Sequence, residues 1–87
     1  MSSGLFNRAG VRYEVACEIF GAIISHHAEI LGFENSKAIA DPAVVVAAQT
    51  AISEINQLRD GLNPKDSAAI ESLIAKYGPL ARQLHVS

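Results

Sequence analysis

The stretch that decides the fold runs from Tyr13 to Leu31 and reads YEVACEIFGAIISHHAEIL. On a helix with about 100° between successive residues, its glutamates, Gly21 and Ser25 fall in one narrow wedge. The remaining, mostly apolar side chains cover roughly 240° of the circumference, whereas a surface helix normally carries a stripe little more than ~100° wide. The stretch therefore predicts a long helix that is covered on more than one side, by the rest of the chain or by a second copy.

The size and composition predict one small domain. The chain has 87 residues, of which 49% are hydrophobic and 18% charged, the latter below the ~25% typical of soluble domains. A chain this small has a limited core and often completes it by oligomerising. A net charge of −2 disfavours nucleic-acid binding, which requires a basic stripe. We expect residues 1–6 to be flexible and, with only one cysteine, the chain to be cytoplasmic.

Neither a leader peptide nor a membrane span is expected in the first helix. The segment Val15-Ala16-Cys17 has the look of a lipoprotein leader, but Arg12 precedes it where an apolar run is needed. Glu18 and two histidines interrupt the ~20 apolar residues that a span requires. We therefore expect no membrane partner.

Capping signals set the limits of the first two helices. The first is predicted over residues 8–31, with Gly32 as its terminating glycine. The second is predicted over residues 42–60, because Asp41 is a good N-cap and Pro42 suits the first helical position.

The same reasoning places two more helices in the C-terminal part. Asn63 followed by Pro64 repeats the start signal and predicts a third helix over residues 64–77. A glycine and a proline then end it, and the apolar register continues into a short fourth helix over residues 79–85. The fold class is thus all-α, a small bundle of three main helices plus a short C-terminal helix, assembled as a dimer.

The dimer is expected because the second and third helices are too short to cover the first. Apolar surface is left over, and a homodimer through the first helix is the simplest way to bury it. A different protein is the other candidate partner. The interface is predicted to involve Tyr13, Ala16, Ile19, Phe20, Ile23, His26, His27 and Ile30.

The two adjacent histidines, His26 and His27, are the only neighbouring pair of functional side chains. Adjacent helical residues diverge by about 100°, so the pair cannot readily chelate one metal ion. Cys17 lies ten residues before His27, roughly 15 Å along the axis, which is too far for a nucleophile and its base. We expect no catalytic, cofactor or metal residues, and interpret the histidines as interface residues, with a pH-sensitive interface as the functional option.

One enzymatic alternative arises from architecture. A dimeric all-helical domain of under a hundred residues with a long first helix resembles, in shape only, the helical chorismate mutases. The resemblance implies a dicarboxylate held between cationic side chains, for which Arg12 and Lys37 are the candidates here. The middle of the helix departs from that pattern, because it has His26 and His27 where arginines are needed. An enzyme is therefore the alternative and not the main reading.

A helix-turn-helix DNA binder is the other alternative, with Gly61-Leu62-Asn63 as the turn. It is disfavoured, because the would-be recognition helix offers one cation, Lys65, beside one anion, Asp66. The sequence favours a small helical protein–protein interaction module: a homodimer, or a subunit of the inhibitor, antitoxin or adaptor type.

Overall fold

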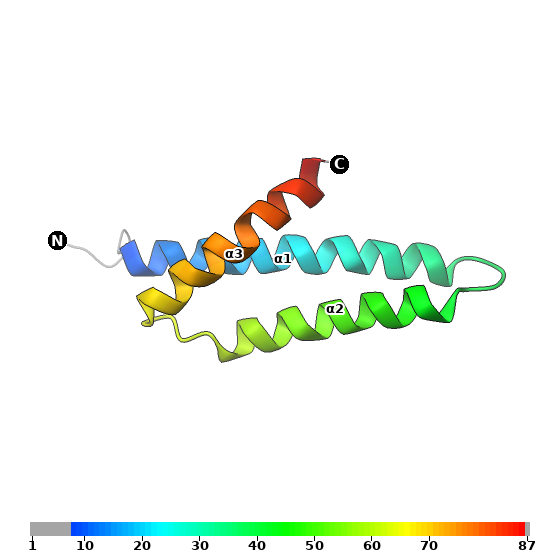
Figure 1. Cartoon of the computed structure of the whole chain (residues 1–87), viewed down its shortest axis with the longest axis horizontal. Helices are drawn as coiled ribbons and strands as arrows, with labels where there is room; N and C mark the ends of the chain where they lie inside the picture. The colour runs from blue at the N-terminus through cyan, green and yellow to red at the C-terminus, as the bar shows by residue number, and fades with distance from the viewer. Residues whose placement is uncertain (1–7, 87) are drawn as a thin grey trace.

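A computed structural model of the chain describes residues 8–86 and contains three α-helices (Figure 1). These are α1 (Arg8–Asn35), α2 (Pro42–Gly61) and α3 (Ser67–Val86), and no strand occurs within the described range. The prediction of an all-α chain with three main helices is confirmed. The expected flexibility of residues 1–6 lies outside the described residues.

The first helix is longer than predicted. It passes through Gly32, whose φ is not positive, and ends at Asn35, after which the Ser36 N–H donates to the carbonyls of Gly32 and Phe33 at 3.1 and 3.2 Å. The extra turn carries Glu34, a carboxylate that is only 5% exposed. The predicted end at residue 31 is therefore wrong, because the helix continues through Gly32 to Asn35. A single glycine is tolerated inside a helix.

Glu34 joins the end of α1 to the start of α2. One carboxylate oxygen accepts the backbone N–H of Asp41 at 2.9 Å, and the other pairs with the Lys37 ammonium at 3.0 Å. Asp41 in turn accepts the Ala43 N–H at 2.9 Å, with Pro42 in the first turn, so the predicted start of α2 is confirmed. The buried carboxylate thus fixes the geometry of the connection, because its charge is met by a donor on each oxygen.

The third helix begins three residues later than predicted. The Asn63 side chain accepts the N–H of Lys65 at 2.9 Å, and the Asp66 N–H donates to the Asn63 carbonyl at 2.9 Å, which makes residues 63–66 a turn. Asp66 is the N-cap, since its carboxylate accepts the Ala69 N–H at 3.1 Å. Asn63 and Asp66 thus both accept a backbone N–H, and the helix starts after the second of them.

The predicted fourth helix over residues 79–85 is wrong as a separate element, because α3 continues through Pro79 to Val86. The ring leaves the carbonyl of Ala75 without its usual helical donor. The helix is retained because Ala81, beyond the proline, is buried in the same core as Ile70, before it.

Figure 1 shows α2 lying antiparallel along α1, while α3 crosses α1 obliquely. Within the described range, α2 and α3 each pack on α1, but their Cα atoms do not come within 8 Å of each other. Phe20 of α1 is fully buried and meets Tyr77 of α3 edge to face, with ring centroids 5.9 Å apart. At the N-terminal end Arg12 binds both carboxylate oxygens of Glu71 at 2.7 and 2.8 Å. The buried core consists of Ala16, Phe20, Ile23, Ile55, Leu62, Ile70 and Ala81.

Candidate functional site

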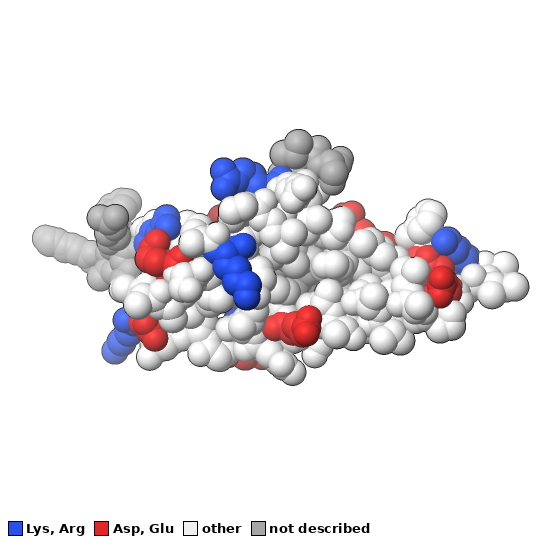
Figure 2. All heavy atoms as spheres, in the orientation of Figure 1, with Lys and Arg blue, Asp and Glu red and all other residues white. Residues whose placement is uncertain are grey.

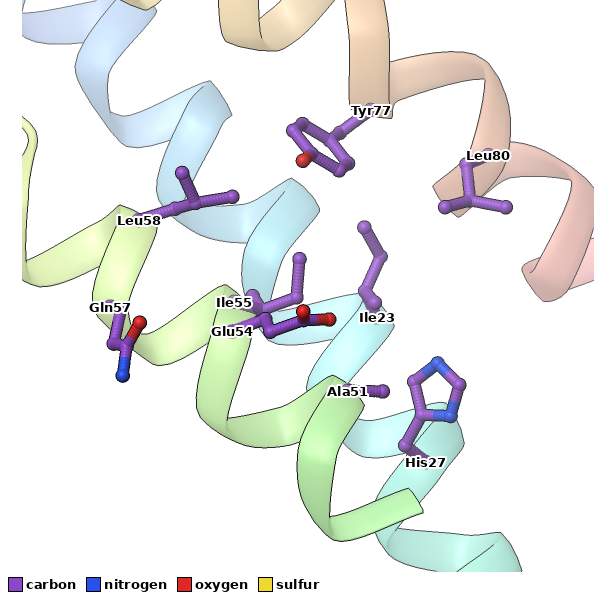
Figure 3. A pocket seen from close by; sticks show the side chains of 9 residues that line it. All are labelled: Ile23, His27, Ala51, Glu54, Ile55, Gln57, Leu58, Tyr77 and Leu80. Atoms are coloured by element: carbon purple, nitrogen blue, oxygen red, sulfur yellow. The ribbon is translucent and has the colours of Figure 1, made fainter. Parts of the chain in front are cut away.

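The divergence of α2 and α3 leaves a groove over α1, which we call the α2–α3 groove (Figure 3). Its volume is about 550 Å³, within the ~300–1,000 Å³ of ligand pockets. The groove is floored by α1 and walled by α2 on one side and α3 on the other. It is lined by Ile23, His27, Ala51, Glu54, Ile55, Gln57, Leu58, Tyr77 and Leu80.

The floor and the rim of the groove differ in exposure. Ile23 of the α1 floor and Ile55 of the α2 wall are 2% and 6% exposed, so both belong to the core. Leu80 is 40% exposed at the α3 wall. Figure 3 shows Tyr77 and Leu80 on the α3 side and Ile23 between the two walls. The groove therefore continues the apolar core outward to an uncovered rim.

The rim carries opposite charges on its two walls. Glu54 lines the groove from α2 and is exposed. On α3 the Lys76 ammonium lies 5.3 Å from the centroid of the Tyr77 ring, and Tyr77 lines the groove. Figure 2 shows acidic atoms over α2 and basic atoms over α3 on this face. The groove is thus apolar inside, with one acidic side chain, Glu54, on the α2 wall and one basic side chain, Lys76, beside Tyr77 of the α3 wall.

The eight residues predicted to form an interface are divided between the core and the surface. Ala16, Phe20 and Ile23 are at most 2% exposed, so they are packed mainly within the single chain, although Ile23 also lines the groove. Tyr13 and Ile19 are partly buried against the same core. The other three, His26, His27 and Ile30, keep partly exposed side chains. Much of the wide apolar arc is therefore covered by α2 and α3.

The two histidines serve different surfaces. Their rings are 5.1 Å apart and inclined at 81°, yet His27 lines the α2–α3 groove while His26 lies in a second hollow of about 380 Å³ with Glu29, Ile30 and Phe33. No cluster of three or more metal-ligating side chains occurs among residues that the structure describes. His27 is the histidine that a groove-bound partner would meet.

Tyr13 and Cys17 occupy one face of α1, one helical turn apart. The Cys17 side chain, as hydrogen-bond partner and nearby ionisable group, raises the pKa of the Tyr13 hydroxyl above its ordinary value. The thiol is partly buried.

Acidification is expected to destabilise the fold in two steps. Burial and, secondarily, His26 lower the pKa of His27 below its ordinary value of 6.5. As the pH falls, the His27 imidazole is therefore protonated in the unfolded chain before it is protonated in the folded one. The free energy of unfolding then decreases as the pH drops below about 6.5. The backbone N–H of Asp41 and then Lys37 lower the pKa of Glu34 below its ordinary value of 4.5, which adds a second loss below about 4.5.

Thermal unfolding followed by circular dichroism between neutral and acid pH tests this expectation. The first step is the smaller, because His27 is only partly buried. His27→Gln removes the first step and keeps the second, which makes Glu34 the internal reference. A first step of undiminished size in His27→Gln contradicts the assignment.

Sequence reasoning missed the groove, although it identified most of the residues that line it as helical. The predicted ranges place Glu54 and Gln57 in the second helix and Leu80 in a separate short helix, and nothing in them brings the two together. The signal available was the 3-4-3-4 spacing of Ile70, Leu73, Tyr77, Leu80 and Leu84, which continues one apolar face past the proline.

Comparison of the chain with protein-family models, with curated proteins and with solved structures gives no match. One helical segment in the described part of the chain, Gly10–Asn35, is long and apolar enough to cross a membrane by length and composition. Core helices of soluble proteins and signal sequences share both properties, so this finding does not assign the chain to a location.

Proposed function

We propose that this chain is a helical protein–protein interaction module that binds another polypeptide in the α2–α3 groove. The observation that carries the proposal is the open groove itself: an apolar floor, an exposed Leu80 at the rim, and two walls that do not touch each other. Apolar rims of this kind commonly mark protein-binding surfaces.

A helix is the element that fits such a groove. Helices that pack on one another lie about 8–10 Å apart, and a further helix between α2 and α3 gives α1 a third neighbour. This is the helix-in-groove mode, in which apolar side chains at helical spacing enter the groove. In this arrangement α1 contributes Ile23 and His27 as the floor, so its role is the base of the interface.

The geometry gives less support to an enzyme of chorismate-mutase-like shape. Arg12 lies near the start of α1 and Lys37 beyond its end, roughly 38 Å apart at 1.5 Å per residue. Each is also engaged within the chain, Arg12 with Glu71 and Lys37 with Glu34. A dicarboxylate needs converging cations, and these two do not converge.

A helix-turn-helix DNA binder has less support as well. Such a unit packs its two helices against each other across a short turn. Within residues 8–86, α2 and α3 pack on α1 and not on one another. Neither alternative explains the apolar groove.

Substitution at the rim tests the proposed function. Leu80→Glu places a charge at the groove, whereas Val46→Glu places the same charge on an exposed position of α2 outside the residues that line it. We expect the wild-type chain and Val46→Glu to form a complex of fixed stoichiometry with the polypeptide that occupies the groove, be it a second copy or a different protein. Sedimentation velocity and quantitative cross-linking measure that complex. Leu80→Glu should weaken that association at least about tenfold, since a desolvated charge costs more than 1.4 kcal/mol. Equal association of the two variants would contradict the proposal.

A further inference from the structure

We infer that the polypeptide bound in the α2–α3 groove is a second copy of this chain, docked face to face so that Glu54 of each copy pairs with Lys76 of the other. This inference rests on the proposed function, and it names the partner for the same surface. The observation that selects the partner is the opposite charge of Glu54 on the α2 wall and Lys76 beside the α3 wall.

Glu54 and Lys76 are both available for an intermolecular contact. Both side chains are exposed, one on the α2 wall and the other beside Tyr77 on the α3 wall. The ion pairs in the described part of the chain are Arg12–Glu71 and Lys37–Glu34, so neither side chain is used in one. An acid and a base therefore flank one apolar groove, and among residues 10–84 neither forms an ion pair.

Symmetry turns this layout into self-complementarity. Most homodimers have a two-fold axis, and the same patch of each subunit forms the interface. An axis that runs along the groove exchanges its walls, so that the α2 wall of one copy faces the α3 wall of the other. Glu54 then meets Lys76 twice per dimer, whereas an axis across the groove would place Glu54 against Glu54. The charges thus favour the first arrangement.

The apolar side chains support the same arrangement. Leu80 is exposed on the α3 side of the groove, whereas Ile23 and Ile55, which also line it, are buried. When the two copies meet, Leu80 of each enters the groove of the other and is removed from water. A chain of 87 residues has a limited core of its own, and self-association is a common way to extend it.

Charge reversal in sedimentation velocity tests the inference on the full-length chain. Wild type is expected to dimerise reversibly at micromolar concentration. Glu54→Lys alone and Lys76→Glu alone should each weaken self-association at least about tenfold, because each puts two like-charge pairs in the dimer. An equimolar mixture of the two variants should restore a dimer, since every contact in the mixed species joins opposite charges.

Two controls make the result specific. Glu14→Lys changes the charge at an exposed site on α1, outside the groove, and should leave the dimer unchanged. Far-UV circular dichroism reports whether each variant keeps its helix content. A dimer that neither reversal weakens, or a mixture that fails to restore it, overturns the inference. A wild-type chain that is monomeric throughout also overturns it, while the effect of Leu80→Glu on a different protein partner would still support the proposed function.

Discussion

Phe20→Ala is expected to lower the free energy of unfolding by about 3–5 kcal/mol. Phe20 is 0% exposed, and its ring meets Tyr77 edge to face across the α1–α3 contact. Its removal leaves a cavity where α1 and α3 cross. Since small domains are stable by only about 5–15 kcal/mol, much of the total is lost. Chemical denaturation measures the change.

Phe33→Ala is the matched control, because it makes the same substitution on the same helix at a side chain that is 69% exposed. Its effect should stay within about 0.5 kcal/mol. If the two variants are equally stable, the core does not lie where α1 meets α3. If Phe33→Ala is the more harmful, the end of α1 is covered by a partner.

Pro79→Ala is expected to stabilise the chain by about 1–3 kcal/mol, an effect of opposite sign. Pro79 is exposed and lies inside α3, where it deprives the Ala75 carbonyl of its donor and crowds the preceding turn. Alanine restores that hydrogen bond. Helix content and the midpoint of unfolding should both rise.

Pro42→Ala is the control for the loss of a proline as such. Pro42 stands in the first turn of α2, where its missing N–H is harmless, so the substitution should leave stability unchanged or reduce it by less than about 1 kcal/mol. If Pro79→Ala instead destabilises the chain, the backbone geometry that Pro79 imposes on α3 is required for Ala81 to reach the core.

The starts of α2 and α3 show how well capping signals in the sequence predict where a helix begins. Asp41-Pro42 predicted the start of α2 correctly, because the side-chain acceptor and the proline agree and no rival follows. The same signal at Asn63-Pro64 was wrong by three residues, because Asp66 is a second acceptor that starts the helix instead. The local sequence is compatible with a helix start at either Asn63 or Asp66, and the packed structure determines which of them is used.

The helix ends were predicted less well. Gly32 was read as a terminus and Pro79 as a boundary, yet both lie inside helices. In each case a residue further along has a tertiary role: the Glu34 carboxylate holds the α1–α2 connection, and Ala81 fills the core. At Gly32, tertiary contacts outweigh the roughly 1 kcal/mol by which glycine is less favourable than alanine inside a helix.

The groove could not be predicted from periodicity. The sequence indicates that Ile23, Leu58 and Leu80 are apolar and helical, but it contains no measure of the angle at which α3 crosses α1. That angle separates α3 from α2 and decides which apolar side chains remain uncovered. The same gap explains why Phe20 was assigned to an interface with another molecule when α3 covers it within the chain.

The central claim is that the α2–α3 groove is the surface at which this chain associates, and methyl NMR tests it most directly. Spectra of the wild-type chain are recorded from low micromolar to millimolar concentration. The account predicts that the methyl signals of Leu58 and Leu80, which line the groove, shift with concentration, while those of Val11 and Val46, exposed elsewhere, stay constant. Shifts at Val11 or Val46 with unchanged groove signals would contradict it.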